Sequence, residues 1–392
     1  MEKNSLHRLG DYIREVDVRN RNLEVRKLLG VSISKEFMPS IANTIGTDMS
    51  SYKVVELRQF VYIADTSRRG DKIAIALLEE DDKVIVSSIY TVFEVRNKLK
   101  LLPEYLMMWF RRPEFDRYAR FKSHGSAREI FSWEEMCDVQ LPVPSIEQQQ
   151  KIVSEYEAVT RRIRLNEQII AKLEETAQAL YRKMFVDGID KENLPDGWRM
   201  GTLGEIAEIN TNNISAKDEF KEIRYLDSSS VTQNVFDEYQ IFNVQQDEIP
   251  SRAKRKVKHN DIVYSTVRPN LKHYGIIKDS VENMIVSTAF AVIHSCYSPI
   301  SNELLYLMLT DEKNTEYLQG IAEMSKATYP SITPEDISAL KITIPIESVS
   351  ISNMNQSIKY CFDSVYYKHQ ENKKLKELQS LLLAKMGEIK TT

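Results

Sequence analysis

Apolar and polar positions alternate most regularly between residues 147 and 185, where apolar side chains recur at steps of four and three. This 4-3 rhythm is the heptad pattern of a coiled-coil helix. At ~1.5 Å per residue such a helix is about 60 Å long. The predicted seam consists of Ile152, Tyr156, Val159, Ile163, Ile170, Leu173, Leu180 and Met184.

A second stretch, residues 348–387, repeats the rhythm with more polar positions midway. Its predicted apolar seam consists of Ile358, Val365, Leu375 and Leu382. The alternative is that both stretches are ordinary helices of a domain core, but a core helix carries a wider apolar face than these stripes. We therefore expect two long helices that pair antiparallel as a coiled coil and hold two domains apart.

The segment before each long helix has the pattern of a mixed α/β domain. Runs rich in β-branched residues predict strands at 84–93, 261–264 and 286–293. Helices are predicted at 103–110 and 303–309, and both domains close on a strand followed by proline. The expected fold class is α+β, with two pseudo-repeated mixed α/β domains and two long antiparallel helices.

Short motifs in the first half of the chain return in the second. Leu9-Gly10-Asp11 returns as Leu203-Gly204-Glu205, and Ile85-Val86-Ser87 returns as Ile285-Val286-Ser287. The predicted boundaries are 1–145 for the first domain, 146–186 for its helix, 187–198 for a linker, 199–346 for the second domain and 347–392 for its helix. A duplicated chain predicts a pseudo-twofold molecule, and duplex DNA is a pseudo-twofold target.

Composition indicates a globular chain, with 392 residues, 42% hydrophobic residues, 12 Gly and 12 Pro. The first residues lack an apolar signal core, no run is long enough for a membrane span, and the three cysteines are scattered. We expect a reduced, cytoplasmic protein with no membrane contact. The net charge of −4 argues weakly against nucleic acid, although local fields decide where a polyanion docks.

The sequence shows no catalytic site. It has no Gly-rich nucleotide or S-adenosylmethionine loop, and no Asn/Asp-Pro-Pro-aromatic loop to hold a flipped base. The six histidines have no metal-ligand spacing. The pattern is that of a binding protein with no catalytic residue, no metal site and no cofactor of its own.

Basic residues cluster in loops of both domains and are the candidates for DNA contact. Charge runs are usually solvated surface, but loops between strands concentrate binding residues, and arginine can recognise guanine with two hydrogen bonds. The candidates in the first domain are Ser67, Arg68, Arg69, Lys72, Lys122, His124 and Arg128. The candidates in the second are Arg252, Lys254, Arg255, Lys256, Lys258, Arg268, Lys272, His273 and Lys326.

Several of these segments resemble the specificity (S) subunit of type I restriction-modification systems. Residues 125–136 resemble the end of a target-recognition domain, 265–277 a recognition-domain loop, 141–149 the entry into the first long helix, and 194–198 the start of a second recognition domain. The first domain lacks the Leu-Pro-x-Gly-Trp opening, and the second helix entry lacks the glutamine pair of Gln148-Gln149.

The resemblance implies a non-catalytic scaffold whose domains each bind one half of a split double-stranded DNA site. The helices would set the spacing and bind two methyltransferase (M) subunits, which methylate adenine N6 with S-adenosylmethionine. Restriction (R) subunits would join with ATP and magnesium. Two alternatives remain: a two-domain coiled-coil adaptor without DNA recognition, and a self-sufficient methyltransferase, against which the missing cofactor loop speaks.

Overall fold

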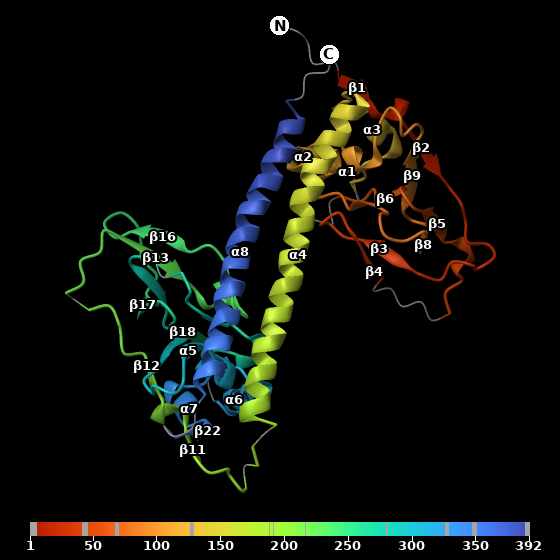
Figure 1. The fold of residues 1–392 in the computed structure, drawn as a ribbon. Helices are drawn as coiled ribbons and strands as arrows, with labels where there is room; N and C mark the ends of the chain where they lie inside the picture. Colours follow the sequence, from red (N-terminus) through yellow and green to blue (C-terminus); the bar gives the residue numbers. More distant parts are fainter. Residues whose placement is uncertain are drawn as a thin grey trace. The chain divides into compact units, whose positions relative to one another are not determined.

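A computed structural model describes residues 6–40, 46–66, 70–125, 129–187, 189–190, 192–215, 217–279, 281–325, 329–346 and 351–388. The chain forms two compact units (Figure 1). The first unit comprises residues 1–165 and 371–392, and the second comprises residues 166–370. Each unit therefore contains one β-rich domain and one half of each long helix.

The β-rich part of the first unit is built on a four-stranded antiparallel sheet in the order β2-β9-β6-β7. Further antiparallel pairs are β1-β10, β3-β4 and β5-β8. The strands are β1 (Leu6–Arg8), β2 (Ile13–Val16), β3 (Leu29–Val31), β4 (Phe37–Pro39), β5 (Lys53–Glu56), β6 (Phe60–Tyr62), β7 (Ile75–Leu77), β8 (Lys83–Val86), β9 (Thr91–Val95) and β10 (Gln140–Pro142).

Helices pack on this sheet and enclose the main core of the first unit. They are α1 (Pro103–Arg111), α2 (Pro113–Phe121) and α3 (Trp133–Cys137). A stack of Phe60 on Phe93, 4.8 Å between ring centroids, lies at the centre of the core, and Phe110 meets both rings edge-on. Val153 and Tyr156 of the first long helix belong to the same core, which seats the domain on that helix.

The second unit contains a sheet with the same order of equivalent strands, β12-β21-β18-β19. A second sheet, β16-β13-β20-β17, is mixed, because β13 and β20 run parallel. The strands are β11 (Trp198–Thr202), β12 (Ala207–Ile209), β13 (Glu222–Leu226), β14 (Val231–Thr232), β15 (Val235–Phe236), β16 (Gln240–Asn243), β17 (Ala253–Lys256), β18 (Ile262–Ser265), β19 (Tyr274–Ile276), β20 (Met284–Ser287), β21 (Phe290–Ser295) and β22 (Lys341–Pro345).

The helices of the second domain repeat those of the first. They are α5 (Asn302–Leu309), α6 (Glu312–Met324) and α7 (Pro334–Ser338). Pairing of β11 with β22 matches that of β1 with β10, so each domain closes by joining its first strand to its last. The predicted helices at 103–110 and 303–309 and the predicted duplication are confirmed.

The predicted strands at 84–93 and 286–293 are wrong in one respect, because each is two strands that belong to different sheets. The chain leaves β8 at Val86 and enters β9 at Thr91, and it leaves β20 at Ser287 and enters β21 at Phe290. Two small hydroxyl residues, Ser87-Ser88 or Ser287-Thr288, stand at each corner, and so short a polar step between apolar runs does not by itself mark a change of sheet. The repeated Ile-Val-Ser motif thus ends at the point where the chain changes sheets.

The long helices are α4 (Ile146–Phe185) and α8 (Ser352–Met386). In the first unit the start of α4 meets the end of α8, where Arg162 pairs with Glu371 at 2.6 Å and Gln379 donates to Thr160 at 2.7 Å. In the second unit the end of α4, with Tyr181, shares a core with Ile358 near the start of α8. The helices therefore pack antiparallel, and the predicted α+β fold class is confirmed.

The twelve predicted seam residues are buried or half-buried. Buried are Tyr156, Ile163, Ile170, Ile358 and Val365. Half-buried are Ile152, Val159, Leu173, Leu180, Met184, Leu375 and Leu382. None of the helices in the described part of the chain combines the length and apolar character needed to cross a bilayer.

Candidate nucleic-acid interface

Two polar loops predicted separately in the second domain lie together. The loop after β18 is tied to residues 330–332 by backbone hydrogen bonds, from Arg268 to the Pro330 carbonyl and from Ile332 to the Thr266 carbonyl, both 2.9 Å. Arg268 has a left-handed backbone, with φ 48°, and is exposed. Its guanidinium lies over the ring of Tyr329, 5.2 Å from the centroid. The stack holds a cation at the surface of the domain.

The first domain builds the same ladder at the equivalent place. Thr66 donates its backbone N–H to Glu129 at 3.2 Å, and Phe131 donates to Ala64 at 2.9 Å. The buried Thr66 hydroxyl also donates to the Ser123 hydroxyl at 2.8 Å, which fixes the loop from the other side. The candidates Ser67, Arg68, Arg69, Arg128 and Lys326 fall outside the described residues.

The basic run of the second domain lies on β17 and its flanks. One edge of β17 pairs with β20, and the other is covered by residues 212–214, where Ile214 donates to Lys254 at 2.8 Å. The turn after β20 connects this run to the first loop, because Thr288 donates to Arg252 and Thr266 donates to Ala289, both at 2.8 Å. The run and the Arg268 loop are therefore parts of one surface.

The five basic side chains of the run differ in how accessible they are to a phosphate. Lys256 is paired with Asp218 at 2.8 Å, and this contact, with the Ser215 backbone, lowers the pKa of Asp218 to about 2. Arg255 is half-buried, and burial lowers the pKa of its guanidinium. Exposed side chains without an ion pair inside the described part of the chain are Arg252, Lys254 and Lys258.

The remaining candidates also divide into exposed side chains and side chains held by other residues of the domain. Lys272 is exposed, with φ 57°, whereas the His273 ring is held by the Val231 carbonyl at 2.8 Å and the Thr232 hydroxyl at 3.1 Å. His273 thus ties the β14–β15 hairpin to β19. In the first domain Lys72 is exposed.

Lys122 and His124 share the carboxylate of Glu135, at 3.4 and 3.7 Å. A side chain already in contact with a carboxylate is less available to a phosphate, so these two residues are weaker candidates than Lys72.

Exposed arginines and lysines on neighbouring loops can bind phosphates, and a fixed arginine can recognise a base edge. Among the described residues, no group of three or more His, Cys, Asp or Glu side chains is placed to hold a metal ion.

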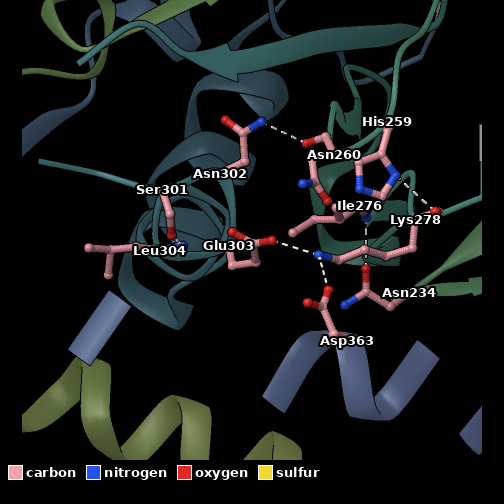
Figure 2. A network of polar contacts seen from close by, with 10 residues as sticks. All are labelled: Asn234, His259, Asn260, Ile276, Lys278, Ser301, Asn302, Glu303, Leu304 and Asp363. Atoms are coloured by element: carbon pink, nitrogen blue, oxygen red, sulfur yellow. Dashed lines mark hydrogen bonds and ion pairs between the residues drawn. The ribbon is translucent and has the colours of Figure 1, made fainter. Parts of the chain in front are cut away.

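Sequence reasoning missed two kinds of residue. Phe121 at the end of α2 and Met324 at the end of α6 are 80% and 78% exposed beside the two loop pairs, and their position at the last turn of an amphipathic helix was the available signal. The buried Lys278, drawn in Figure 2, was also missed, and the signal was a lysine two residues after the apolar strand β19.

Two domains that share the strand order of one sheet, each with a paired polar loop and each packed on the antiparallel long helices, define a duplicated two-domain scaffold. The family model for the "Type I restriction modification DNA specificity domain" matches residues 49–175 and 195–380. The chain belongs to this family. This is the family that the sequence resemblance predicts.

A curated relative is the "Type I restriction enzyme HindI specificity subunit" of Haemophilus influenzae, 33% identical over 151 residues. The match covers 38% of this chain and 32% of the relative, so the chain matches about a third of that protein. A solved S subunit of a type I restriction-modification system from M. genitalium has a TM-score of 0.63 at 11% identity, over 98% of this chain and 96% of that one. This likeness supports the fold.

Proposed function

We propose that each β-rich domain of this chain binds one half of a bipartite double-stranded DNA site. The observation that carries the proposal is the loop pair that both domains build at the equivalent position, through Thr66 and Glu129 in one and Arg268 and Pro330 in the other. In both domains basic candidates lie on or beside this ladder. A duplicated surface of this kind suits two half-sites on one duplex.

Arg268 is the residue proposed to contact a base edge. Arg252, Lys254, Lys258, Lys272 and Lys72 are proposed to contact phosphates, because they are exposed and carry no ion pair within the described residues. With a net charge of −4 the chain does not neutralise many phosphates by itself. Part of the neutralisation is therefore assigned to partner subunits.

The long helices are proposed to set the spacing between half-sites and to bind two M subunits. Large side chains on the helices stay exposed outside the shared seam, including Leu165 and Leu381 in the first unit and Tyr360 and Tyr367 in the second. Exposed aromatic and aliphatic side chains on a helix surface favour a protein partner.

The cofactors, the further subunits and the location that we propose are those that the family implies. The M subunits would bring S-adenosylmethionine for adenine-N6 methylation, and R subunits would join with ATP and magnesium for cleavage. The assembled complex would act in the cytoplasm.

Co-expression with the cognate M subunit tests the proposal. The expected result is a complex with two M subunits per chain that methylates one split sequence, found by mapping methylated adenines across a genome. A chain that stays apart from M, or a complex whose methylation does not depend on this chain, would contradict the proposal.

A further inference from the structure

A buried lysine joins the second domain to α8. Figure 2 shows the Lys278 ammonium between two carboxylates, Glu303 Oε1 at 2.6 Å and Asp363 Oδ1 at 2.8 Å. Lys278 follows β19, Glu303 lies in the first turn of α5, and Asp363 lies on α8. The side chains of Lys278 and Glu303 are 8% and 3% exposed, and that of Asp363 is 34% exposed. All three residues lie within the second unit.

Surrounding hydrogen bonds fix the two domain-side members. His259 contacts the Lys278 carbonyl through Nδ1 at 3.0 Å, and Asn302 donates to the Asn260 carbonyl at 2.9 Å. Ser301 caps α5 by accepting from Leu304 at 3.2 Å, which anchors the turn that carries Glu303 (Figure 2). Lys278 is therefore presented to α8 from a rigid base, and Asp363 is the member supplied by the helix.

Ion pairs of this kind do little for stability, since desolvation of the charges offsets most of their attraction. Their effect is to favour one geometry, because any other arrangement leaves a buried charge without a partner. The trio is thus suited to fixing how the second domain is seated on α8.

The first domain makes a comparable contact, of reversed polarity, one residue further along the chain. The residue two places after β7 is Glu79, where Lys278 stands two places after β19. The neighbouring Glu80 pairs with Arg164 of α4 at 3.0 Å. In the first unit an acidic residue of the domain therefore pairs with a basic residue of α4. In the second unit a basic residue of the domain pairs with an acidic residue of α8. The Glu80–Arg164 pair is exposed and is worth little energetically.

We propose that Lys278 is a positioning residue: its contact with Asp363 fixes the angle of the second recognition domain on α8 and so restricts the complex to one spacer length between half-sites. The proposal rests on the proposed function, because a spacer has meaning only if both domains bind DNA. It adds to that function a specificity determinant whose ammonium is directed to two carboxylates and not to the DNA.

The test replaces Asp363 in the full complex with M subunits. Asp363→Lys sets two ammonium groups against each other and leaves the Lys278–Glu303 pair inside the domain. The expected result is methylation of both original half-sites at spacers one base pair longer and shorter, at least tenfold above wild type. Faster hydrogen exchange is expected in residues 274–279 and at the start of α8.

A charge-reversed triple variant tests whether the ion pairs are the cause of the single spacer. Lys278→Glu, Glu303→Lys and Asp363→Lys together reverse every charge and restore each attraction, so the single spacer should return. The matched control is Arg164→Glu, which reverses the exposed contact of the first unit and should leave the spacer and the exchange rates unchanged.

A single spacer with wild-type hydrogen exchange in Asp363→Lys would overturn the proposal. Relaxed spacing that the charge-reversed triple variant fails to correct would also overturn it. Should Asp363→Lys not assemble, Asp363→Asn removes the attraction without adding a charge, and a wild-type spacer and exchange pattern there would be equally decisive. If the wild-type complex recognises no split site at all, it is the proposed function that fails.

Discussion

The guanidinium of Arg268 lies 5.2 Å from the centre of the Tyr329 ring, and a backbone hydrogen bond of 2.9 Å from Arg268 to Pro330 holds the two segments together. Sixty residues of chain separate the two side chains, so the contact exists only in the folded domain. It gives an exposed arginine a defined direction, which is what recognition of a base edge requires.

Arg268→Ala should weaken binding of the complex to its own site by about 1–3 kcal/mol and relax specificity at one base position in the second half-site. Tyr329→Leu keeps the cation and removes its platform, so a smaller loss, about 0.5–1 kcal/mol, is expected. Fluorescence anisotropy with a panel of single-base variants measures both. Arg199→Ala, which removes an exposed arginine paired with Glu205, is the control and should change little. Equal losses for every base variant would place Arg268 on a phosphate.

Replacing Arg252, Lys254 and Lys258 together with alanine should weaken binding to all sequences alike. Each lost phosphate contact reduces the slope of log K against log salt by about 0.9, so the slope should fall by up to about 2.7. Lys256→Ala is the matched control, because that lysine is paired with Asp218, and it should change the slope less. A salt slope identical to wild type in the triple variant would remove this run from the interface.

The first turns of α8 offer a matched pair for separating packing from partner binding. Ile358 is fully buried, so Ile358→Ala should lower the free energy of unfolding by about 2–4 kcal/mol. Tyr360 is 64% exposed, so Tyr360→Ala should leave stability within about 0.5 kcal/mol and weaken binding of the M subunit. Denaturant titration and pull-down with M measure the two effects. Normal M binding in Tyr360→Ala would move the docking surface elsewhere on the helices.

The Asp218–Lys256 pair predicts a pH dependence in the acid range. Since the pKa of Asp218 is lowered to about 2 in the folded chain, against about 3.9 when unfolded, the pair stabilises the fold above pH ~4. This contribution is lost as the pH falls from about 4 through 2. Asp218→Asn should therefore be less stable than wild type at pH 5 and equal to it near pH ~1, below both pKa values, as measured by urea denaturation. A stability difference that persists at pH ~1 would show another cause.

Local patterns were sufficient to predict the long helices, the duplication and the existence of two α/β domains. The corner at Ser287 was not predictable, because a Ser-Thr step between two apolar runs does not by itself mark a change of sheet. The sequence also could not predict which basic side chains of residues 252–258 are exposed, because a bulge between Ala253 and Arg255 shifts which side chains face outward. The Lys278 trio comes from three separate elements, and sequence spacing does not bring such residues together.

The central claim is that each domain recognises its own half-site, and exchanging one domain tests it most directly. Residues 6–140 are replaced with the first domain of another family member, and the complex with M subunits is expressed in cells. Mapping of methylated adenines should then show a new first half-site, with the second half-site unchanged. A change in both halves, or in neither, would contradict independent recognition by the two domains.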